Sequence, residues 1–292
     1  LLAKSPTLAC VEQLLLDSNS IGNAGAGAIA ESKQLESLAD LYLYDNDYNG
    51  TSETALMDLR IRLLLKRHFS GTKLNLNGQR LENAGLKALA RSDQLAGVET
   101  LSLRNNHFDH AGLEALAQSK HLTSLKSLNL MDNPIRNKGA IILAESKAFS
   151  GLRNLNLENC GIMPAGVLAL ARSETLNGLE EITLNKNEIK ERGFQHLTAS
   201  ENFTNLKSLR AGDVFIGDLA VKSITLSAYL GKLEELCLNG NSITRDGIDT
   251  LCNASNLKAL KKIDFRRNLM QYEDCILLAD LPHFKKMEVV RF

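Results

Sequence analysis

The sequence predicts an α/β solenoid, with short parallel β-strands on a concave face and helices on a convex face. The first observation is a repeat, because ten residues recur in register behind the same leucine frame: Asn19, Asn46, Gln79, Asn106, Asn133, Cys160, Asn187, Val214, Asn241 and Asn268. These ladder residues follow one another at steps of 27 residues, with one step of 33 between the second and the third. The second observation is that each unit changes from strand spacing to helical spacing of its apolar residues. Repeats of this length stack into elongated arrays.

The unit at 125–149 shows how one repeat is built. Leu125, Leu128 and Leu130 alternate with polar residues, which predicts a short strand. Asn133 follows at the turn, where its side chain can donate to and accept from backbone groups that stacked strands leave unpaired. Gly139 then marks the start of a helix whose apolar residues recur at helical spacing.

Each helix is expected to begin near a recurring glycine and to end with a small residue followed by a serine. The glycines are Gly25, Gly85, Gly112, Gly139, Gly166, Gly193 and Gly247, and the serines are Ser32, Ser92, Ser119, Ser146 and Ser173. A side chain at the glycine would crowd the neighbouring turn, and small residues let stacked helices approach closely. Because the helical layer is the larger one, the array is expected to curve into a horseshoe.

The repeat L-x-x-L-x-L-x-x-N-x-I-x-x-x-G-x-x-x-L-A-x-S-x-x-L, read from Leu2 to Phe292, resembles the ribonuclease-inhibitor-like class of leucine-rich repeats. Its Ala-x-Ser-x-x-Leu ending is most similar to arrays of bacterial proteins. The resemblance implies a leucine-rich-repeat horseshoe that acts as a protein-binding scaffold. It does not imply ribonuclease inhibition, because that activity depends on surface residues that have no match here.

Residues 1–292 are predicted to form a single leucine-rich-repeat domain of about ten 27-residue units, truncated mid-repeat at both ends. The opening residues 2–8 match the helix end of other units, and the closing residues 287–292 begin an eleventh strand. Solenoids normally carry polar caps on their terminal units. We therefore expect the chain to be a piece of a longer protein.

Composition and charge limit the classes of partner and the cellular compartment that the sequence supports. The 34 basic residues balance the 34 acidic ones, so the charge gives no support for a nucleic-acid partner or an anionic membrane. No apolar run approaches the roughly 18 residues of a membrane span, and no membrane insertion is expected. The five cysteines fit as lone small side chains, as Cys160 does in its ladder position. Isolated thiols favour a cytoplasmic localisation.

Two units depart from the frame. The second carries six extra residues in the segment 54–68, which is rich in leucine and in basic side chains. This segment is either a longer helix with a solvated basic side or a protrusion that contacts a partner or an adjoining domain. The eighth unit has Ala211 in place of a strand leucine, Val214 in the ladder and Ala220 in place of the glycine. We expect it to be the least stable unit of the array, since replacing a buried leucine with alanine typically lowers the free energy of unfolding by about 2–5 kcal/mol.

Strand residues between the leucines are expected to face the concave side. We predict that the ligand-binding residues lie there: Leu15, Asp17, Tyr42, Tyr44, Asn75, Asn77, Arg104, Asn129, Met131, Asn156, Glu158, Asn185 and Arg210. Leu15, Tyr42 and Tyr44 form an apolar and aromatic patch, and the asparagines form a neutral amide floor. A basic tilt marks the last units, through Arg210, Lys262, Arg266, Arg267 and Arg291.

Each zone has two interpretations. Exposed tyrosines beside a polar rim are typical of an interface, but they can also cover their own strand neighbours. The amide floor suits a peptide, a glycan or water. The basic end is either part of the binding surface or a solvated face.

No catalytic arrangement, cofactor site or metal site is expected. His107, Asp109 and His110 lie close in sequence, but in a turn on the rim, where imidazoles are more often solvated than bound to zinc. The phosphate-binding and nucleophile-elbow motifs are absent from the sequence. The protein is therefore not expected to be an enzyme.

The leading functional hypothesis is a scaffold that binds a protein or peptide through its concave β-sheet face. Two alternatives stay open. One is a regulatory or structural arm of a larger multidomain protein, and the other is a carbohydrate or cell-surface recognition module. Sequence alone identifies neither the partner nor the oligomeric state.

Overall fold

The structure, a computed structural model, describes residues 2–35, 37–38, 40–43, 45–279 and 287–291, with only the backbone described for 277–279. Strands and helices alternate along it. The strands are β1 (Gln13–Leu15), β2 (Asp40–Tyr42), β3 (Phe69–Ser70), β4 (Lys73–Asn75), β5 (Thr100–Ser102), β6 (Ser127–Asn129), β7 (Asn154–Asn156), β8 (Glu181–Thr183), β9 (Ser208–Arg210), β10 (Glu235–Cys237), β11 (Lys262–Asp264) and β12 (Val289–Arg291).

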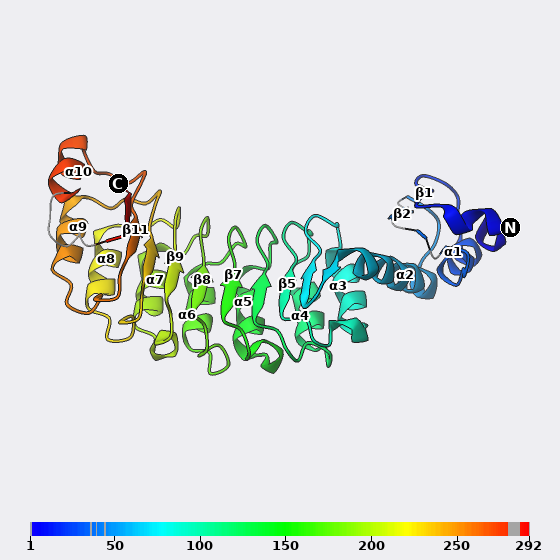
Figure 1. Cartoon of the computed structure of the whole chain (residues 1–292), viewed down its shortest axis with the longest axis horizontal. Helices are drawn as coiled ribbons and strands as arrows, with labels where there is room; N and C mark the ends of the chain where they lie inside the picture. Colours follow the sequence, from blue (N-terminus) through cyan, green and yellow to red (C-terminus); the bar gives the residue numbers. More distant parts are fainter. Residues whose placement is uncertain (1, 36, 39, 44, 280–286, 292) are drawn as a thin grey trace.

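The helices share one layer on the other side of the units (Figure 1). They are α1 (Asn23–Ala30), α2 (Gly50–His68), α3 (Glu82–Arg91), α4 (His110–Ala117), α5 (Arg136–Glu145), α6 (Pro164–Ala171), α7 (Lys190–Thr198), α8 (Asp218–Thr225), α9 (Arg245–Cys252) and α10 (Tyr272–Ala279). No helix in the described ranges is long and apolar enough to cross a membrane.

Strands β4 to β12 run parallel, and each pairs with the next at an offset of one repeat. Asn75 lies opposite Ser102, Ser102 opposite Asn129, and Asn129 opposite Asn156. Equivalent residues of successive units therefore form rows across the sheet. The predicted fold class, a leucine-rich-repeat solenoid with a parallel sheet and a helical layer, is confirmed.

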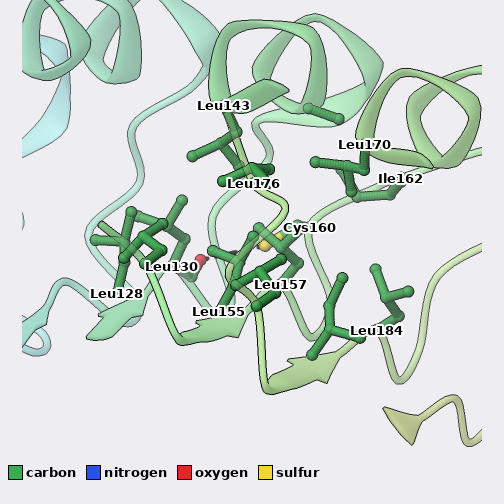
Figure 2. Close-up of a cluster of buried hydrophobic side chains, with 14 of the residues drawn as sticks. Leu128, Leu130, Leu143, Leu155, Leu157, Cys160, Ile162, Leu170, Leu176 and Leu184 are labelled. Atoms are coloured by element: carbon green, nitrogen blue, oxygen red, sulfur yellow. Dashed lines mark hydrogen bonds between the residues drawn. The ribbon is translucent and has the colours of Figure 1, made fainter. Parts of the chain in front are cut away.

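The leucine frame fills the space between the two layers. Figure 2 shows Leu128 and Leu155 from the sheet packing toward Leu143 and Leu170 from the helices. All four side chains are at most 2% exposed. Cys160 lies in the same cluster, and burial raises the pKa of its thiol to about 12. The core of the units from β4 onward is thus one apolar cluster, and the first two units have a cluster of their own.

The ladder asparagines join neighbouring units, as the sequence predicted. The Nδ2 group of Asn133 donates to the carbonyls of Leu103 and Leu130, each at 2.9 Å, and its Oδ1 accepts from the amide of Asn106 at 2.9 Å. At Cys160 the thiol donates to the carbonyl of Leu130 at 3.2 Å and keeps part of this arrangement. Buried asparagines are tolerated here because their polar atoms are bonded.

The serine at each helix end has a second role. Ser119 Oγ donates to the carbonyl of Ala90 at 2.7 Å, and Ser173 Oγ donates to that of Ala144 at 2.6 Å. Each bond satisfies a carbonyl at the end of the preceding helix, which the helix itself leaves unpaired. In the Ala-x-Ser pattern, the alanine lets neighbouring helices approach closely, and the serine links them by a hydrogen bond.

The parallel sheet is not continuous over all units, which corrects one detail of the prediction. Among the described residues, β1 and β2 form a two-stranded sheet, and β3 to β12 form a separate ten-stranded sheet. Strand β3 turns back at Gly71, where φ is +60°, and pairs antiparallel with β4. It occupies the edge that β2 would take in a regular array. The assignment of 1–292 to a single domain remains a prediction.

The six extra residues lengthen α2, and this helix packs against both sheets. Leu56, Leu59 and Leu63 of this helix pack in the core of the first two units. Ile61, Leu64 and Leu65 pack in the core of the main array. The interpretation of the insertion as a longer helix is confirmed, and its contact with a partner stays a prediction. In Figure 1, α2 bridges the two sheets.

Arg60 of α2 replaces a missing backbone contact at this junction. In several other units the carbonyl of the ladder residue accepts an amide from the preceding unit, as Asn106 does from Glu82 at 2.9 Å and Cys160 from Arg136 at 2.9 Å. At the junction, the carbonyl of Gln79 accepts instead from Arg60 Nη2 at 2.5 Å, and that of Arg80 accepts from Nη1 at 3.4 Å. The guanidinium thus caps the first regular unit of the long sheet.

The eighth unit keeps its place in the array despite its substitutions. Ala211 and Val214 are fully buried, and the next ladder residue supplies the bonds. Asn241 Nδ2 donates to the carbonyl of Ala211 at 2.9 Å, and its Oδ1 accepts from the amide of Val214 at 3.0 Å. The lower stability of this unit stays a prediction.

Candidate functional site

The exposed face of the ten-stranded sheet carries most of the predicted binding residues. Asn75, Asn129, Asn156 and Arg210 end strands β4, β6, β7 and β9. A second row follows two residues later, with Asn77, Arg104, Met131, Glu158 and Asn185. Every one of these side chains is exposed or half-buried, because the leucines between them point to the opposite side of the strand. The structure therefore brings these residues together on one surface.

The apolar patch lies on the other sheet. Leu15 and Tyr42 are directly opposite in the β1–β2 pair and are 66% and 38% exposed. Asp17 follows β1 and is exposed, whereas Tyr44 lies outside the described residues. Because β2 does not pair with β4, Leu15 and Tyr42 are not part of the same row as Asn75. The predicted surface is thus divided in two at the junction.

The amides of the first row are bonded to their own strands. The Oδ1 atoms of Asn75, Asn129 and Asn156 each accept from the backbone amide two residues later, at 3.1, 3.0 and 2.9 Å. Asp264 repeats this contact in β11, where its Oδ1 accepts from the amide of Arg266 at 3.1 Å. These carboxamides are therefore held in one orientation.

The second row is bonded across units. Asn77 Oδ1 accepts from the amide of Arg104 at 2.9 Å and from Ser102 Oγ at 2.7 Å. Asn185 Oδ1 accepts from the amide of Gly212 at 2.8 Å, and its Nδ2 donates to Glu158 at 3.3 Å. These bonds fix the surface side chains of Asn77 and Asn185 against the neighbouring units.

The charges beside the amide floor neutralise each other. Glu158 pairs with Lys186 at 2.7 Å, and Arg104 pairs with Asp132 at 3.0 Å. The hydrogen bond and charge of Glu158 raise the pKa of Lys186. Surface pairs of this kind contribute little to stability. Because each pair joins opposite charges, they give this part of the face neither a positive nor a negative electrostatic potential.

Three arginines of the basic end form ion pairs, and its two interpretations, as part of the binding surface or as a solvated face, stay open. Arg210 pairs with Glu235 at 2.8 Å, Arg266 with Asp264 at 2.6 Å, and Arg267 with Asp213 at 2.8 Å. Burial pushes the pKa of Glu235 upward, but the hydrogen bond and charge of Arg210 outweigh it, and the pKa is lowered. The arginines are thus engaged with carboxylates of the protein itself.

A charged edge runs along the start of the strands, and the sequence analysis missed it. Lys126 pairs with Glu99 at 2.5 Å, Lys207 with Glu180 at 2.7 Å and Lys261 with Glu234 at 2.7 Å. Each partner lies one repeat away. The hydrogen bond from Lys207 lowers the pKa of Glu180. The signal was present in the sequence as opposite charges at a 27-residue step.

The histidine-rich turn has a structural role through its aspartate. Asp109 is the N-cap of α4, and its Oδ1 accepts from the amide of Ala111 at 2.8 Å. This hydrogen bond lowers the pKa of Asp109. Across the described parts of the chain, no three His, Cys, Asp or Glu side chains gather in a way that could hold a metal ion.

Two adjoining cavities lie at the junction between the sheets. One, of about 200 Å³, is lined by apolar and charged residues of β2, α2 and the start of α3, and the other, of about 300 Å³, reaches the turn after β4. Leu41, Arg60 and Arg80 line both. The cavities exist because the sheet is interrupted at this point.

The comparisons with known proteins identify the repeat. The family described as Leucine Rich repeat matches residues 98–117 and 121–144. None of the curated proteins matches the chain. Among solved structures, an internalin (inlF) from Listeria monocytogenes is 19% identical with a TM-score of 0.43, covering 98% of this chain and 88% of its own.

Two further structures are similar at the same level. An internalin C2 (inlC2) from Listeria monocytogenes is 18% identical with a TM-score of 0.41, covering 75% of this chain and 84% of its own. TLR13, solved as a complex with ssRNA13, is 18% identical with a TM-score of 0.45, covering 97% of this chain and 36% of its own.

The family match bears on the repeat and not on a particular ligand. Leucine-rich-repeat proteins commonly mediate recognition of proteins or other ligands. The ribonuclease-inhibitor-like subtype, the bacterial type, the cytoplasmic localisation and the exclusion of nucleic acid remain predictions. The repeats, the sheet register and the helical layer together identify the chain as a leucine-rich-repeat solenoid.

Proposed function

We propose that this protein binds a protein or peptide ligand through the concave face of its ten-stranded sheet. The supporting observation is that side chains of this face from β4 to β9 remain exposed or half-buried, apart from Ser208, while the opposite side of the same strands is buried. A sheet that is packed on one side and open on the other offers a broad, rigid surface.

The chemistry of the face favours a protein ligand over a polyanion. Several of its charged side chains are engaged in ion pairs, such as Lys186 with Glu158 and Arg104 with Asp132. Nucleic acid requires cations free to replace counterions, and single strands also require aromatic stacking platforms. In the rows of β4 to β9 the exposed positions hold no aromatic side chain.

Site-specific photocrosslinking tests this proposal. A benzoylphenylalanine at Met131, on the concave face, is expected to crosslink a bound protein, whereas the same group at Ile141, 40% exposed on α5, is not. Both positions are apolar and accessible, so the pair is matched. Crosslinking from Ile141 alone would show that the helical face is the recognition surface.

The two alternatives predict different outcomes. A regulatory arm of a larger protein would crosslink from the concave position to a segment of its own full-length chain. A carbohydrate module would give no protein adduct from either position and would retain a glycan on an array.

A further inference from the structure

Four concave carboxamides have a fixed direction. In Asn75, Asn129 and Asn156, Oδ1 accepts from the strand's own backbone, and in Asn77 it accepts from the next unit. A rotated carboxamide would set its NH₂ group against a backbone N–H, and two donors repel. The Oδ1 atoms therefore stay turned toward the protein.

The same geometry turns the NH₂ groups outward. Over the described residues, none of these four NH₂ groups donates to another protein group, in contrast to Asn185, whose Nδ2 donates to Glu158. We call Asn75, Asn77, Asn129 and Asn156 the amide row. Its members present donors to the concave space, and the acceptor atom of each side chain already accepts a backbone N–H.

Strand register sets the spacing of the amide row. Asn129 and Asn156 lie on adjacent strands, and Asn75 lies two strands from Asn129. Neighbouring strands are about 4.8 Å apart, so the donors follow the axis of the solenoid over about 15 Å. A ligand that uses all of them must be extended along this axis.

The charge and the hydrogen-bonding groups of the amide row limit the chemical class of ligand that it can bind. The amide row itself is uncharged, and the nearby cations of Arg104 and Lys186 are held by the carboxylates of Asp132 and Glu158. Sugar hydroxyls donate as well as accept, whereas the NH₂ donors of the row have no protein partner among the described residues and each Oδ1 already accepts a backbone N–H. A main-chain carbonyl only accepts, so it matches a row of donors without leaving a donor unpaired.

We propose that the amide row binds an extended, uncharged peptide segment through its main-chain carbonyls. This inference rests on the proposed concave-face function and adds the chemistry of recognition. Recognition through main-chain carbonyls fixes the direction and register of the peptide, while the side chains of the peptide reach the flanking units.

Asp264 suggests a substitution that removes the NH₂ donors and leaves the backbone contact in place. Asp264 makes the same contact to the amide two residues later as the asparagines do, so Asn129→Asp with Asn156→Asp keeps this contact and removes both NH₂ groups. Asn129→Ser with Asn156→Ser restores a short donor of the kind present at Ser102. Gln118→Glu, exposed on the helical side, is the matched amide-to-acid control.

The probe is a linear random-peptide display library selected on the folded chain, with affinities of selected peptides measured by fluorescence anisotropy. The double aspartate variant is expected to bind about tenfold more weakly or worse, since two hydrogen bonds are lost. Gln118→Glu is expected to bind as the unchanged chain does, and the double serine variant to keep most of the affinity. The urea midpoint of the aspartate variant should be unchanged.

The other outcomes separate this inference from the proposed function. Peptides that crosslink at Met131 but bind the aspartate variant normally would overturn the role of the amide row and leave concave binding intact. Peptides that crosslink only at Ile141 would overturn both. Amide-dependent binding of a single-stranded RNA or of an oligosaccharide on an array, without peptide binding, would overturn the choice of a peptide.

Discussion

Replacing Asn133 with alanine tests how the ladder holds the array together. The Asn133 side chain is fully buried. Its Nδ2 donates to the carbonyls of Leu103 and Leu130 at 2.9 Å, and its Oδ1 accepts from the amide of Asn106 at 2.9 Å. Asn133→Ala removes these bonds and leaves the buried amide of Asn106 without its partner. The Leu103 carbonyl, in contrast, still accepts from Asn106 Nδ2 at 2.8 Å, and the Leu130 carbonyl from the Cys160 thiol at 3.2 Å.

The magnitude follows from the number of bonds. Each intramolecular hydrogen bond contributes about 1 kcal/mol net, and leaving a buried partner unsatisfied costs about 1–3 kcal/mol. Asn133→Ala loses these three bonds and a longer fourth one, from Nδ2 to the Met131 carbonyl at 3.2 Å, so it is expected to lower the free energy of unfolding by about 3–4 kcal/mol. Asn133→Cys should cost less, because a thiol in the ladder still reaches a carbonyl, as Cys160 does at 3.2 Å.

Urea unfolding monitored by circular dichroism measures the effect. Asn129→Ala is the matched control, since Asn129 is half-buried on the surface of the same unit and its Oδ1 accepts one backbone bond. It is expected to cost about 1 kcal/mol or less. Equal losses for Asn133→Ala and Asn129→Ala would refute the view that the buried ladder carries the inter-unit bonds.

Three other predictions follow from the junction and from the cysteines. Arg60→Ala should raise amide hydrogen exchange in α2 and in residues 76–81 while β6 to β9 stay protected, because the guanidinium bonded to the Gln79 carbonyl is lost; uniform protection would contradict this. Cys160, with a pKa of about 12, should resist a thiol reagent at pH 8 in the folded chain, whereas exposed Cys10 should react; rapid modification of both would contradict the burial. The folded-state pKa of Cys160 lies above its ordinary value of 9.0, so its contribution to stability is complete below about pH 9 and is lost as pH rises toward 12; a Cys160→Ser chain should lack this alkaline component in urea titrations at several pH values.

The rows of the sheet and the core were predictable because a fixed period transfers the environment of one unit to all. Once Leu128 and Asn129 are placed on opposite sides of a strand, Leu155 and Asn156 follow. The ladder role of Asn133 also follows, since a turn without strand partners needs a side chain that both donates and accepts.

The interruption after the second unit was not predictable from the length of the insertion. Six extra residues fit a longer helix equally well with or without a continuous sheet. The signal was Gly71, which stands where other units have a leucine and adopts a φ of +60° in the turn between β3 and β4. A turn at this position lets Phe69 and Ser70 fold back on β4 and occupy its edge.

The orientation of the concave amides was not predictable either. Sequence places Asn75 and Asn77 on the same face, but one bonds within its strand and the other reaches the next unit. That choice depends on which backbone amide lies within reach of each side chain, and only the three-dimensional structure shows it.

The central claim is that the concave amides meet the ligand, and side-chain NH₂ resonances observe them directly. With a library-selected peptide added to the isotope-labelled chain, the NH₂ signals of Asn129 and Asn156 are expected to shift strongly and in step with binding. The signal of Gln118 on the helical side should stay in place. Saturating peptide that shifts Gln118 and leaves Asn129 and Asn156 unmoved would contradict the account.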